Sequence, residues 1–185
     1  TATTEIYTLS LHDALPIYCM PAQGWVKVGD RNLSLDGSMA TLDWGRGVWT
    51  YANTWYWGSL STRLSDNSTF GFNIGYGFGD VSDFSENALF YNGEMSKLSR
   101  VVFHIPQKNG KDDFLSQWRF TSDDGRFEMA FDPILDRRDH TNALIISSYQ
   151  DQVFGRFYGT AVLDSGKKIV LNGQIGFAEK VINKW

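Results

Sequence analysis

The chain has 185 residues, of which 42% are hydrophobic, 15% aromatic and 21% charged, with a formal charge of −4. This composition is typical of a globular protein with an aromatic excess, and the length predicts one domain. The negative charge argues against non-specific nucleic-acid binding, which requires clustered Lys and Arg. No apolar run approaches the roughly 20 residues of a transmembrane helix. The single cysteine, Cys19, precludes an intramolecular disulfide and favours a reducing, cytoplasmic location.

The first 17 residues, TATTEIYTLSLHDALPI, differ from the rest of the chain. They read as the in-frame translation of a common sequencing-library adapter, without turn chemistry or an amphipathic period. They also lack the basic start and the continuous apolar core of a signal peptide. We therefore expect residues 1–17 to be an adapter-derived, disordered segment, with a genuine disordered arm as the alternative. Residues 18–185 then form a single β-barrel-like domain.

From Tyr18 onward, hydrophobic residues recur with a period of two, as in β-strands. Short polar turns separate the alternating runs, and Asn92-Gly93 is the strongest hairpin signal among them. The other hairpin turns lie at 108–111, 122–125 and 164–166. No segment has a clear helical pattern. About nine strands joined by short turns predict an all-β, antiparallel meander that closes, or nearly closes, into a barrel.

Two segments carry a more specific expectation. In residues 70–79, FGFNIGYGFG, large apolar residues occupy one face of the strand and glycines occupy most of the other. Such a glycine stripe indicates either strand curvature at barrel closure or a ligand lying flat on the strand. Residues 133–142 begin with a proline and are rich in charge, so we expect a connection there and no central strand.

A tryptophan-rich stretch stands out at residues 42–58, LDWGRGVWTYANTWYWG. It holds four of the seven tryptophans of the chain, Trp44, Trp49, Trp55 and Trp57. So many indoles in one stretch require burial or stacking on another group. The stretch therefore predicts the wall of a cavity or the seam of a β-barrel.

Several motifs of this chain, in the same order, resemble those of domain-of-unknown-function family 2804, and together they cover residues 18–185. The motifs are Asp43-Trp44-Gly45-Arg46-Gly47, Glu86-Asn87-x-Leu89-Phe90, Ser122-Asp123-Asp124-Gly125-Arg126, Phe131-x-Pro133, Gln152-x-Phe154-Gly155 and Gly173-x-x-Gly176-x-x-Glu179. One small departure is Ser85, where a threonine is expected.

The resemblance implies a lipocalin-like, calycin-type β-barrel, distantly similar to carotenoid hydratase-like proteins, which pair two such barrels. Members of the family are longer, so the resemblance implies that this chain is the C-terminal half of a two-barrel protein. The missing N-terminal half of the same chain is then an expected partner. The family has no established activity, and the resemblance therefore implies a fold without a function.

Charged residues beside the aromatic stretch are candidates for a polar site. Asp43 and Arg46 flank a glycine, so they either pair and cap the backbone or stand at the mouth of an aromatic cavity. In the second case, Arg46 orients an anionic or polar head group. Glu86 begins a strand with Asn87, and a carboxylate pointing into an aromatic barrel can act as a general acid. The structural alternative is a buried Glu86 bonded to Arg46 or Arg126.

The aromatic residues provide either a plain core or a ligand-binding wall. The candidate ligand-binding residues are Arg46, Trp49, Trp55, Trp57, Phe72, Tyr76, Asn87, Trp118 and Arg126, and the candidate catalytic residues, if the protein is an enzyme, are Glu86 and Asp43. His104 and His140 alone do not make a zinc site, and 123–126 reads as a β-turn and no calcium loop. No phosphate-binding or dinucleotide motif occurs, so we expect neither a metal nor a cofactor.

Three hypotheses follow. The first is a binding module whose aromatic interior holds a hydrophobic or amphipathic small molecule. The second is an enzyme of the hydratase or cyclase type, with Glu86 or Asp43 as the general acid. The third is a ligand-free, structural half-barrel that completes the missing N-terminal half.

Overall fold

The computed structural model describes residues 12–14, 17–43, 45–47, 50–77 and 85–184, and for 12–14 and 45–47 it describes the backbone alone. All regular structure in these residues is β-strand, which confirms the predicted all-β class. The described residues contain no helix able to cross a membrane.

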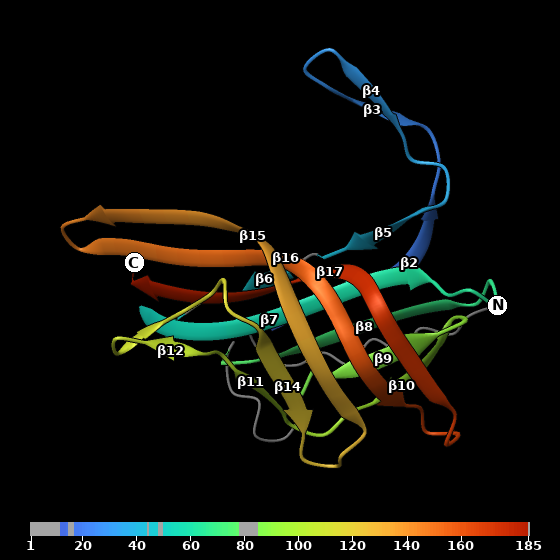
Figure 1. Cartoon of the computed structure of the whole chain (residues 1–185). Helices are drawn as coiled ribbons and strands as arrows, with labels where there is room; N and C mark the ends of the chain where they lie inside the picture. The colour runs from blue at the N-terminus through green and yellow to red at the C-terminus, as the bar shows by residue number, and fades with distance from the viewer. Residues whose placement is uncertain (1–11, 15–16, 44, 48–49, 78–84, 185) are drawn as a thin grey trace.

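Nine strands form one antiparallel sheet, in the order β10-β9-β8-β7-β17-β16-β15-β14-β11 (Figure 1). Their bounds are β7 Ala52–Arg63, β8 Thr69–Tyr76, β9 Ala88–Tyr91, β10 Glu94–Lys97, β11 Val101–His104, β14 Trp118–Ser122, β15 Phe127–Ala143, β16 Ile146–Val162 and β17 Lys168–Lys184. The sheet is made of two meanders, and the last strand of the chain, β17, joins them by pairing with β7. The sheet curls into a half-barrel.

Short ladders accompany this sheet. They are β1 (His12–Ala14) with β6 (Gly45–Gly47), β2 (Ile17–Ala22) with β5 (Ser38–Leu42), β3 (Trp25–Val28) with β4 (Arg31–Ser34), and β12 (Gln107–Lys108) with β13 (Lys111–Asp112). The predicted hairpin at Asn92-Gly93 is confirmed. Both residues have a positive φ, 48° and 84°, as a two-residue turn of type I′ requires between β9 and β10.

The interior of the half-barrel is packed with aromatic rings. Phe72, on β8, meets Phe127 and Phe157 edge-on at centroid distances of 5.1 and 5.0 Å, and all three side chains are fully buried. Trp118 and Phe131 pack against each other in the same way, with centroids 5.6 Å apart. Edge-on pairs stabilise a core beyond the area that they bury. These described rings therefore form a close-packed aromatic core on the inner face of the half-barrel.

The glycine stripe of β8 lies on the outer face of the sheet, opposite this core. A Cβ at Gly71 would lie 2.7 Å from the Sγ atom of Cys19, and one at Gly75 would lie 2.5 Å from the carbonyl oxygen of Tyr56. The stripe therefore permits strand curvature and the close approach of β2. Strand curvature at barrel closure and a ligand on the strand both stay predictions, and the close approach of neighbouring chain atoms is the reason for small residues that these distances give.

The outer face of β7 and β8 is partly covered by β2 and β5 (Figure 1). The Cys19 amide donates a hydrogen bond to Ser61 Oγ at 3.2 Å, and Thr41 Oγ1 lies 3.0 Å from the same oxygen. Tyr18 is buried between the layers. The part of the outer face of β7 that lies under β2 and β5 is thus shielded from solvent.

The expectation for residues 133–142 is wrong, because β15 runs from Phe127 to Ala143 and pairs with β16 along its length. The pairing of β14 with β15 ends at Phe131. Beyond that point β15 is an edge strand, and a register shift lies between Pro133 and Leu135. The missing N–H of Pro133 therefore falls where a bulge begins and the neighbouring strand ends, and a proline is tolerated there.

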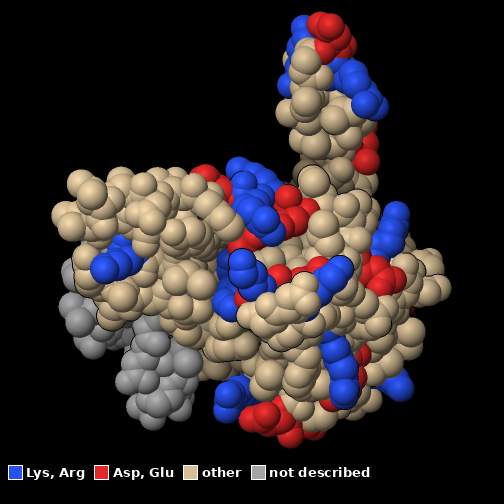
Figure 2. All heavy atoms as spheres, turned by 60° about the vertical axis from the view of Figure 1, so that its left-hand side comes forward, with Lys and Arg blue, Asp and Glu red and all other residues tan. Residues whose placement is uncertain are grey.

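The β3–β4 hairpin projects from the sheet (Figure 1), and its strands are exposed along their whole length. Trp25 is 68% exposed and Val28 59%. Figure 2 shows the hairpin standing clear of the body, with charges of both signs around its tip. Isolated two-stranded hairpins are marginally stable in water, so this arm is the least supported ladder of the described chain.

Candidate functional site

The outer face of the sheet carries a buried carboxylate. Glu179, on β17, is 4% exposed and lies in register between Trp57 on β7 and Gln152 on β16. Its Oε2 atom accepts hydrogen bonds from Gln152 Nε2 at 2.9 Å and Gln150 Nε2 at 3.2 Å. The indole N–H of Trp55 donates to Oε1 at 3.4 Å. These donors are neutral, so they orient the carboxyl group without cancelling its charge.

The environment changes the acidity of Glu179. Burial raises the pKa of its carboxyl, and the charge of Asp43 raises it further. The hydrogen bonds from Gln150, Gln152 and Trp55 act in the opposite direction. A carboxyl group that holds its proton more tightly than a free glutamic acid is suited to proton donation.

An amide on β8 joins this group to the covering strand β2. The Oδ1 atom of Asn73 accepts hydrogen bonds from Trp57 Nε1 and from the hydroxyl of Tyr18, each at 2.6 Å. Its Nδ2 atom donates to the backbone oxygen of Glu86 at 3.1 Å. The Tyr18 ring stacks on Phe90, with centroids 4.7 Å apart. Burial raises the pKa of the Tyr18 hydroxyl, which keeps it protonated as a donor.

Two further carboxyl groups act on this site. Glu86 is exposed at the surface, but neighbouring protein atoms remove part of the water around its carboxyl group. This desolvation raises the pKa of Glu86, and the negative charge of Asp43 raises it further. Desolvation also raises the pKa of Asp43. The charge of Asp43 acts on Tyr18, Glu86 and Glu179 alike. We call Asp43, Glu86 and Glu179 the carboxylate cluster.

The predicted site residues fall into separate parts of the fold. Trp55 and Trp57 lie beside Glu179, and the two candidate acids, Glu86 and Asp43, are the other members of the carboxylate cluster. By contrast, Phe72 and Trp118 belong to the buried core on the inner face, and Tyr76 packs against that core. The backbone of Arg46 lies on β6 and its side chain is not described, whereas Trp49 lies outside the described residues.

Asn87 has a structural part in the same segment as Glu86. Its Oδ1 atom accepts a hydrogen bond from the amide of Gly75 at 2.6 Å, and its Nδ2 atom donates to the Ser99 carbonyl at 3.3 Å. Asn87 is 2% exposed. It therefore ties the segment that carries Glu86 to β8 and to the loop before β11.

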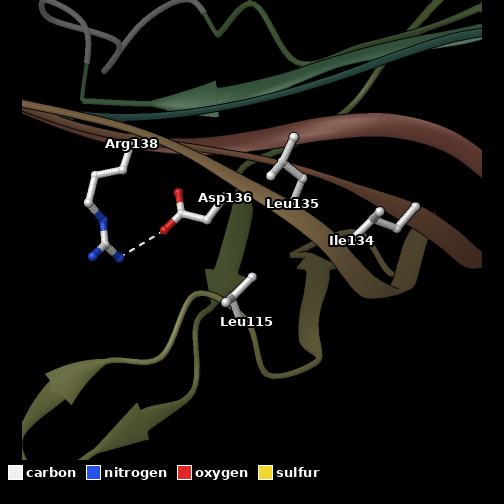
Figure 3. A pocket seen from close by; sticks show the side chains of 5 residues that line it. All are labelled: Leu115, Ile134, Leu135, Asp136 and Arg138. Carbon is white, nitrogen blue, oxygen red and sulfur yellow. Dashed lines mark hydrogen bonds and ion pairs between the residues drawn. The ribbon is translucent and has the colours of Figure 1, made fainter.

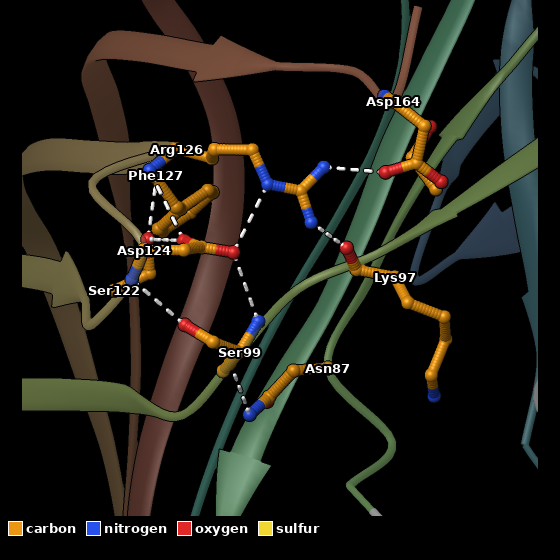
Figure 4. Close-up of polar contacts among 9 residues, drawn as sticks. Asn87, Lys97, Ser99, Ser122, Asp124, Arg126, Phe127 and Asp164 are labelled. Carbon is orange, nitrogen blue, oxygen red and sulfur yellow. Dashed lines mark hydrogen bonds and ion pairs between the residues drawn. The ribbon is translucent and has the colours of Figure 1, made fainter.

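Arg126 lies in a separate polar network at the turn between β14 and β15 (Figure 4). Its Nε atom donates to Asp124 at 3.0 Å, its Nη1 atom pairs with Asp164 at 2.5 Å, and its Nη2 atom contacts the Lys97 carbonyl. Ser122 and Ser99 complete the bonds to Asp124. These contacts connect three turns of the sheet, and they do not include Glu86.

A shallow pocket of about 310 Å³ lies where β15 leaves β14, lined by Leu115, Ile134, Leu135, Asp136 and Arg138 (Figure 3). Arg138 Nη2 donates to Asp136 at 2.8 Å, and Arg138 Nε donates to Asp151 at 2.6 Å. This pocket lies on the inner face of the extended sheet and contains no predicted site residue. Its polar groups are already paired with one another, apart from one oxygen of Asp136.

Sequence reasoning missed residues that complete the carboxylate site. They are Tyr18, Asn73, Gln150, Gln152 and Glu179. Gln152 and Glu179 stand in motifs that carry the family resemblance, but nothing in their spacing reveals that β16 and β17 place them in register. The signal that could have found them is the occurrence of Gln150, Gln152 and Glu179 within strand segments whose other residues are largely apolar, because polar residues at such positions need hydrogen-bond partners on a neighbouring strand.

Within the part of the chain that the structure describes, no group of three or more His, Cys, Asp or Glu side chains could hold a metal ion. The fold and the site thus define a β half-barrel domain with a buried, hydrogen-bonded carboxylate beside tryptophans on its outer face. A family model, the domain of unknown function DUF2804, matches residues 15–185, and the chain belongs to this family. No functionally curated protein and no solved structure matches the chain.

Proposed function

We propose that this domain binds a hydrophobic or amphipathic small molecule on its outer face, with Trp55 and Trp57 as the apolar wall and Glu179 at the polar end. The observation that carries the proposal is the buried Glu179 carboxylate, which neutral donors hold in place beside the two indoles. Ligand sites combine aromatic surface with a few oriented polar groups. A preorganised carboxylate with a raised pKa is unusual for a purely structural position.

The close-packed aromatic core on the inner face supports placing the ligand on the outer face. The inner face is filled by rings such as Phe72 and Phe157, which leave the outer face as the aromatic surface beside polar groups. Lipocalin-like architecture, which the family resemblance implies, is part of the same proposal. A second β-rich part of the same protein as a partner, and a cytoplasmic location, also belong to the proposal.

The test uses 10-bromodecan-1-ol, whose bromine quenches tryptophan fluorescence at short range. Titration of the chain is expected to give saturable quenching, and Trp57→Phe is expected to reduce its amplitude. The matched control is Trp25→Phe, on the exposed β3 strand. Quenching that does not saturate, or that the two substitutions change equally, contradicts the proposal.

The second candidate is an enzyme of the hydratase or cyclase type. The raised pKa values of Glu86 and Asp43 favour it, because protonation of an alkene needs a carboxyl group that retains its proton. In the hydration step, the proton adds to one alkene carbon, water attacks the other, and the oxonium loses a proton.

For the enzyme candidate, incubation with an isoprenoid alkene in heavy water should place deuterium on carbon and form an alcohol. Loss of this product in Glu86→Gln, with quenching by 10-bromodecan-1-ol retained, would distinguish the enzyme from the binding module. A chain that neither binds nor reacts would fit the ligand-free half-barrel.

A further inference from the structure

We propose that the polar end of the ligand is a cationic amine, so that the ligand is an alkylammonium or a related amphiphile with an ammonium group. This inference rests on the proposed function and specifies its ligand class. It is carried by the charge of the site and by hydrogen-bond acceptors on the same face that have no donor.

Carboxyl groups predominate among the charged groups at the site, and Glu179 itself accepts hydrogen bonds from neutral donors. Two described cations lie near the carboxylate cluster: Lys97 acts on Glu86, and Arg137, on β15, donates to Gln152 Oε1 at 3.3 Å and so is separated from Glu179 by the Gln152 side chain. Lys97 is an exposed residue whose Nζ atom donates to the carbonyl oxygen of Ser85. The lysine that follows Glu179, Lys180, points to the opposite face, where it pairs with Asp112 at 2.5 Å. A cation that enters the site therefore gains attraction from Glu179, which forms no ion pair with a described side chain.

Two buried side-chain amide oxygens on the outer face are also available as hydrogen-bond acceptors. Asn183 and Asn53 pair in register on β17 and β7, and the buried Oδ1 atoms of both have no hydrogen-bond partner among the residues that the structure describes. Asn183 is 3% exposed. Because side chains alternate along a strand, Asn183 projects from the same face of β17 as Glu179. A buried acceptor without a donor destabilises the protein, and a ligand that supplies N–H groups removes this cost.

Trp55 lies between the two sets of acceptors. It pairs in register with Val181, the residue midway between Glu179 and Asn183 on β17. Consecutive residues on one face of a strand are roughly 6.5–7 Å apart, so the carboxylate and the amides flank the indole. Indole rings attract cations through their electron-rich faces. The face thus combines carboxylate, amide oxygen and indole, which together recognise an ammonium group.

Other head groups fit less well. A carboxylate would be repelled by Glu179, Glu86 and Asp43, and it would bring no donor to the amide oxygens. A hydroxyl would bring a single donor and no charge. A primary ammonium group brings three donors and a positive charge. The chemistry of the face therefore selects the amine.

The experiment compares three decyl compounds at neutral pH by calorimetric titration, below the concentrations at which they form micelles. They are decylammonium, decan-1-ol and decanoate, which share the alkyl chain and differ in the head group. We expect decylammonium to bind about tenfold tighter than the alcohol, or more, and decanoate to bind weakest. Glu179→Gln should remove most of the preference for the amine. Glu94→Gln, the same change at an exposed position on β10, should leave the preference intact.

The other outcomes separate a failure of the amine inference from a failure of the binding function. Equal affinities for the amine and the alcohol would overturn the amine inference and leave the binding function standing. The absence of binding by all three compounds would remove the binding function itself. A preference that survives Glu179→Gln would also overturn the inference. Should that variant fail to fold, Asp43→Asn at a solvent-exposed residue decides in its place, because removing the Asp43 charge should weaken the preference.

Discussion

The hydroxyl of Tyr18 donates a 2.6 Å hydrogen bond to the side-chain oxygen of Asn73, a residue 55 positions further along the chain. This bond fastens β2 to the outer face of β8. The same oxygen accepts the indole N–H of Trp57, so one amide determines the position of both the covering strand and the aromatic wall. The candidate site therefore depends on β2 as well as on the main sheet.

Replacing this hydroxyl tests the connection. Tyr18→Phe should lower the free energy of unfolding by about 1 kcal/mol, because Asn73 keeps its second donor but loses one buried bond. Urea denaturation followed by fluorescence gives the value. The matched control is Tyr51→Phe, which removes a bond from an exposed hydroxyl to the Ile145 carbonyl and should cost less. Similar losses of unfolding free energy in the two variants would show that the buried Tyr18 bond stabilises the protein no more than an exposed bond does.

Glu179 gives the stability of the protein a defined pH dependence. Its pKa in the folded chain is raised above the value of about 4.3 for a free glutamic acid, so the folded state binds the proton more tightly. The stabilisation from this proton is complete below the unfolded pKa and is lost as pH rises through the folded pKa. The unfolding free energy of the wild type, relative to Glu179→Gln, should therefore fall as pH rises above the unfolded pKa and become constant once pH exceeds the folded pKa. Glu94→Gln controls for the loss of one negative charge, and a constant difference between wild type and Glu179→Gln would refute the assignment.

Asp124 should show the opposite dependence. Hydrogen bonds from Ser122, Arg126 and Ser99 outweigh desolvation and lower the pKa of its carboxyl well below the usual range. Its contribution is present above the unfolded pKa and is lost as pH falls. Asp124→Asn should lower the unfolding free energy by about 1–2 kcal/mol at neutral pH, a range reduced for partial exposure, and by less in acid. The neighbouring Asp123→Asn, in the same turn and exposed, should have little effect at either pH.

The strand pattern was predictable because its signals are local. The Asn92-Gly93 turn and the alternation in β8 each depend on a few adjacent residues, and the structure has both. Pro133 misled the prediction for a physical reason. A proline excludes a central strand, but β15 becomes an edge strand at that residue, and this change depends on where β14 ends.

The site was less predictable because it depends on register between strands that are distant in sequence. Trp55 and Trp57 were identified from their density in the chain. Their partner Glu179 lies more than a hundred residues away, and only the pairing of β17 with β7 brings it beside them. For Phe72 and Trp118, the same composition that suggests a ligand wall also suits a core, and alternation alone does not say which face of a curled sheet is filled.

A last prediction concerns the curvature of the sheet. Gly159 and Gly166 both have a positive φ, 143° and 82°. A Cβ at Gly159 would collide with the backbone oxygen of Glu128 on β15, whereas a Cβ at Gly166, in the turn between β16 and β17, would meet no atom within 4 Å. Both glycines thus avoid the strain of a positive φ, but only Gly159 also avoids a backbone clash.

Gly166→Ala should therefore lower the unfolding free energy by about 1 kcal/mol, the cost of the left-handed conformation. Gly159→Ala should lower it by roughly 2–4 kcal/mol, because two paired strands must also move apart. Urea denaturation of the two variants under one set of conditions measures the difference directly. Equal losses would mean that β15 and β16 separate at little cost at this point, and the close contact at Gly159 would then have no part in holding the curl of the sheet.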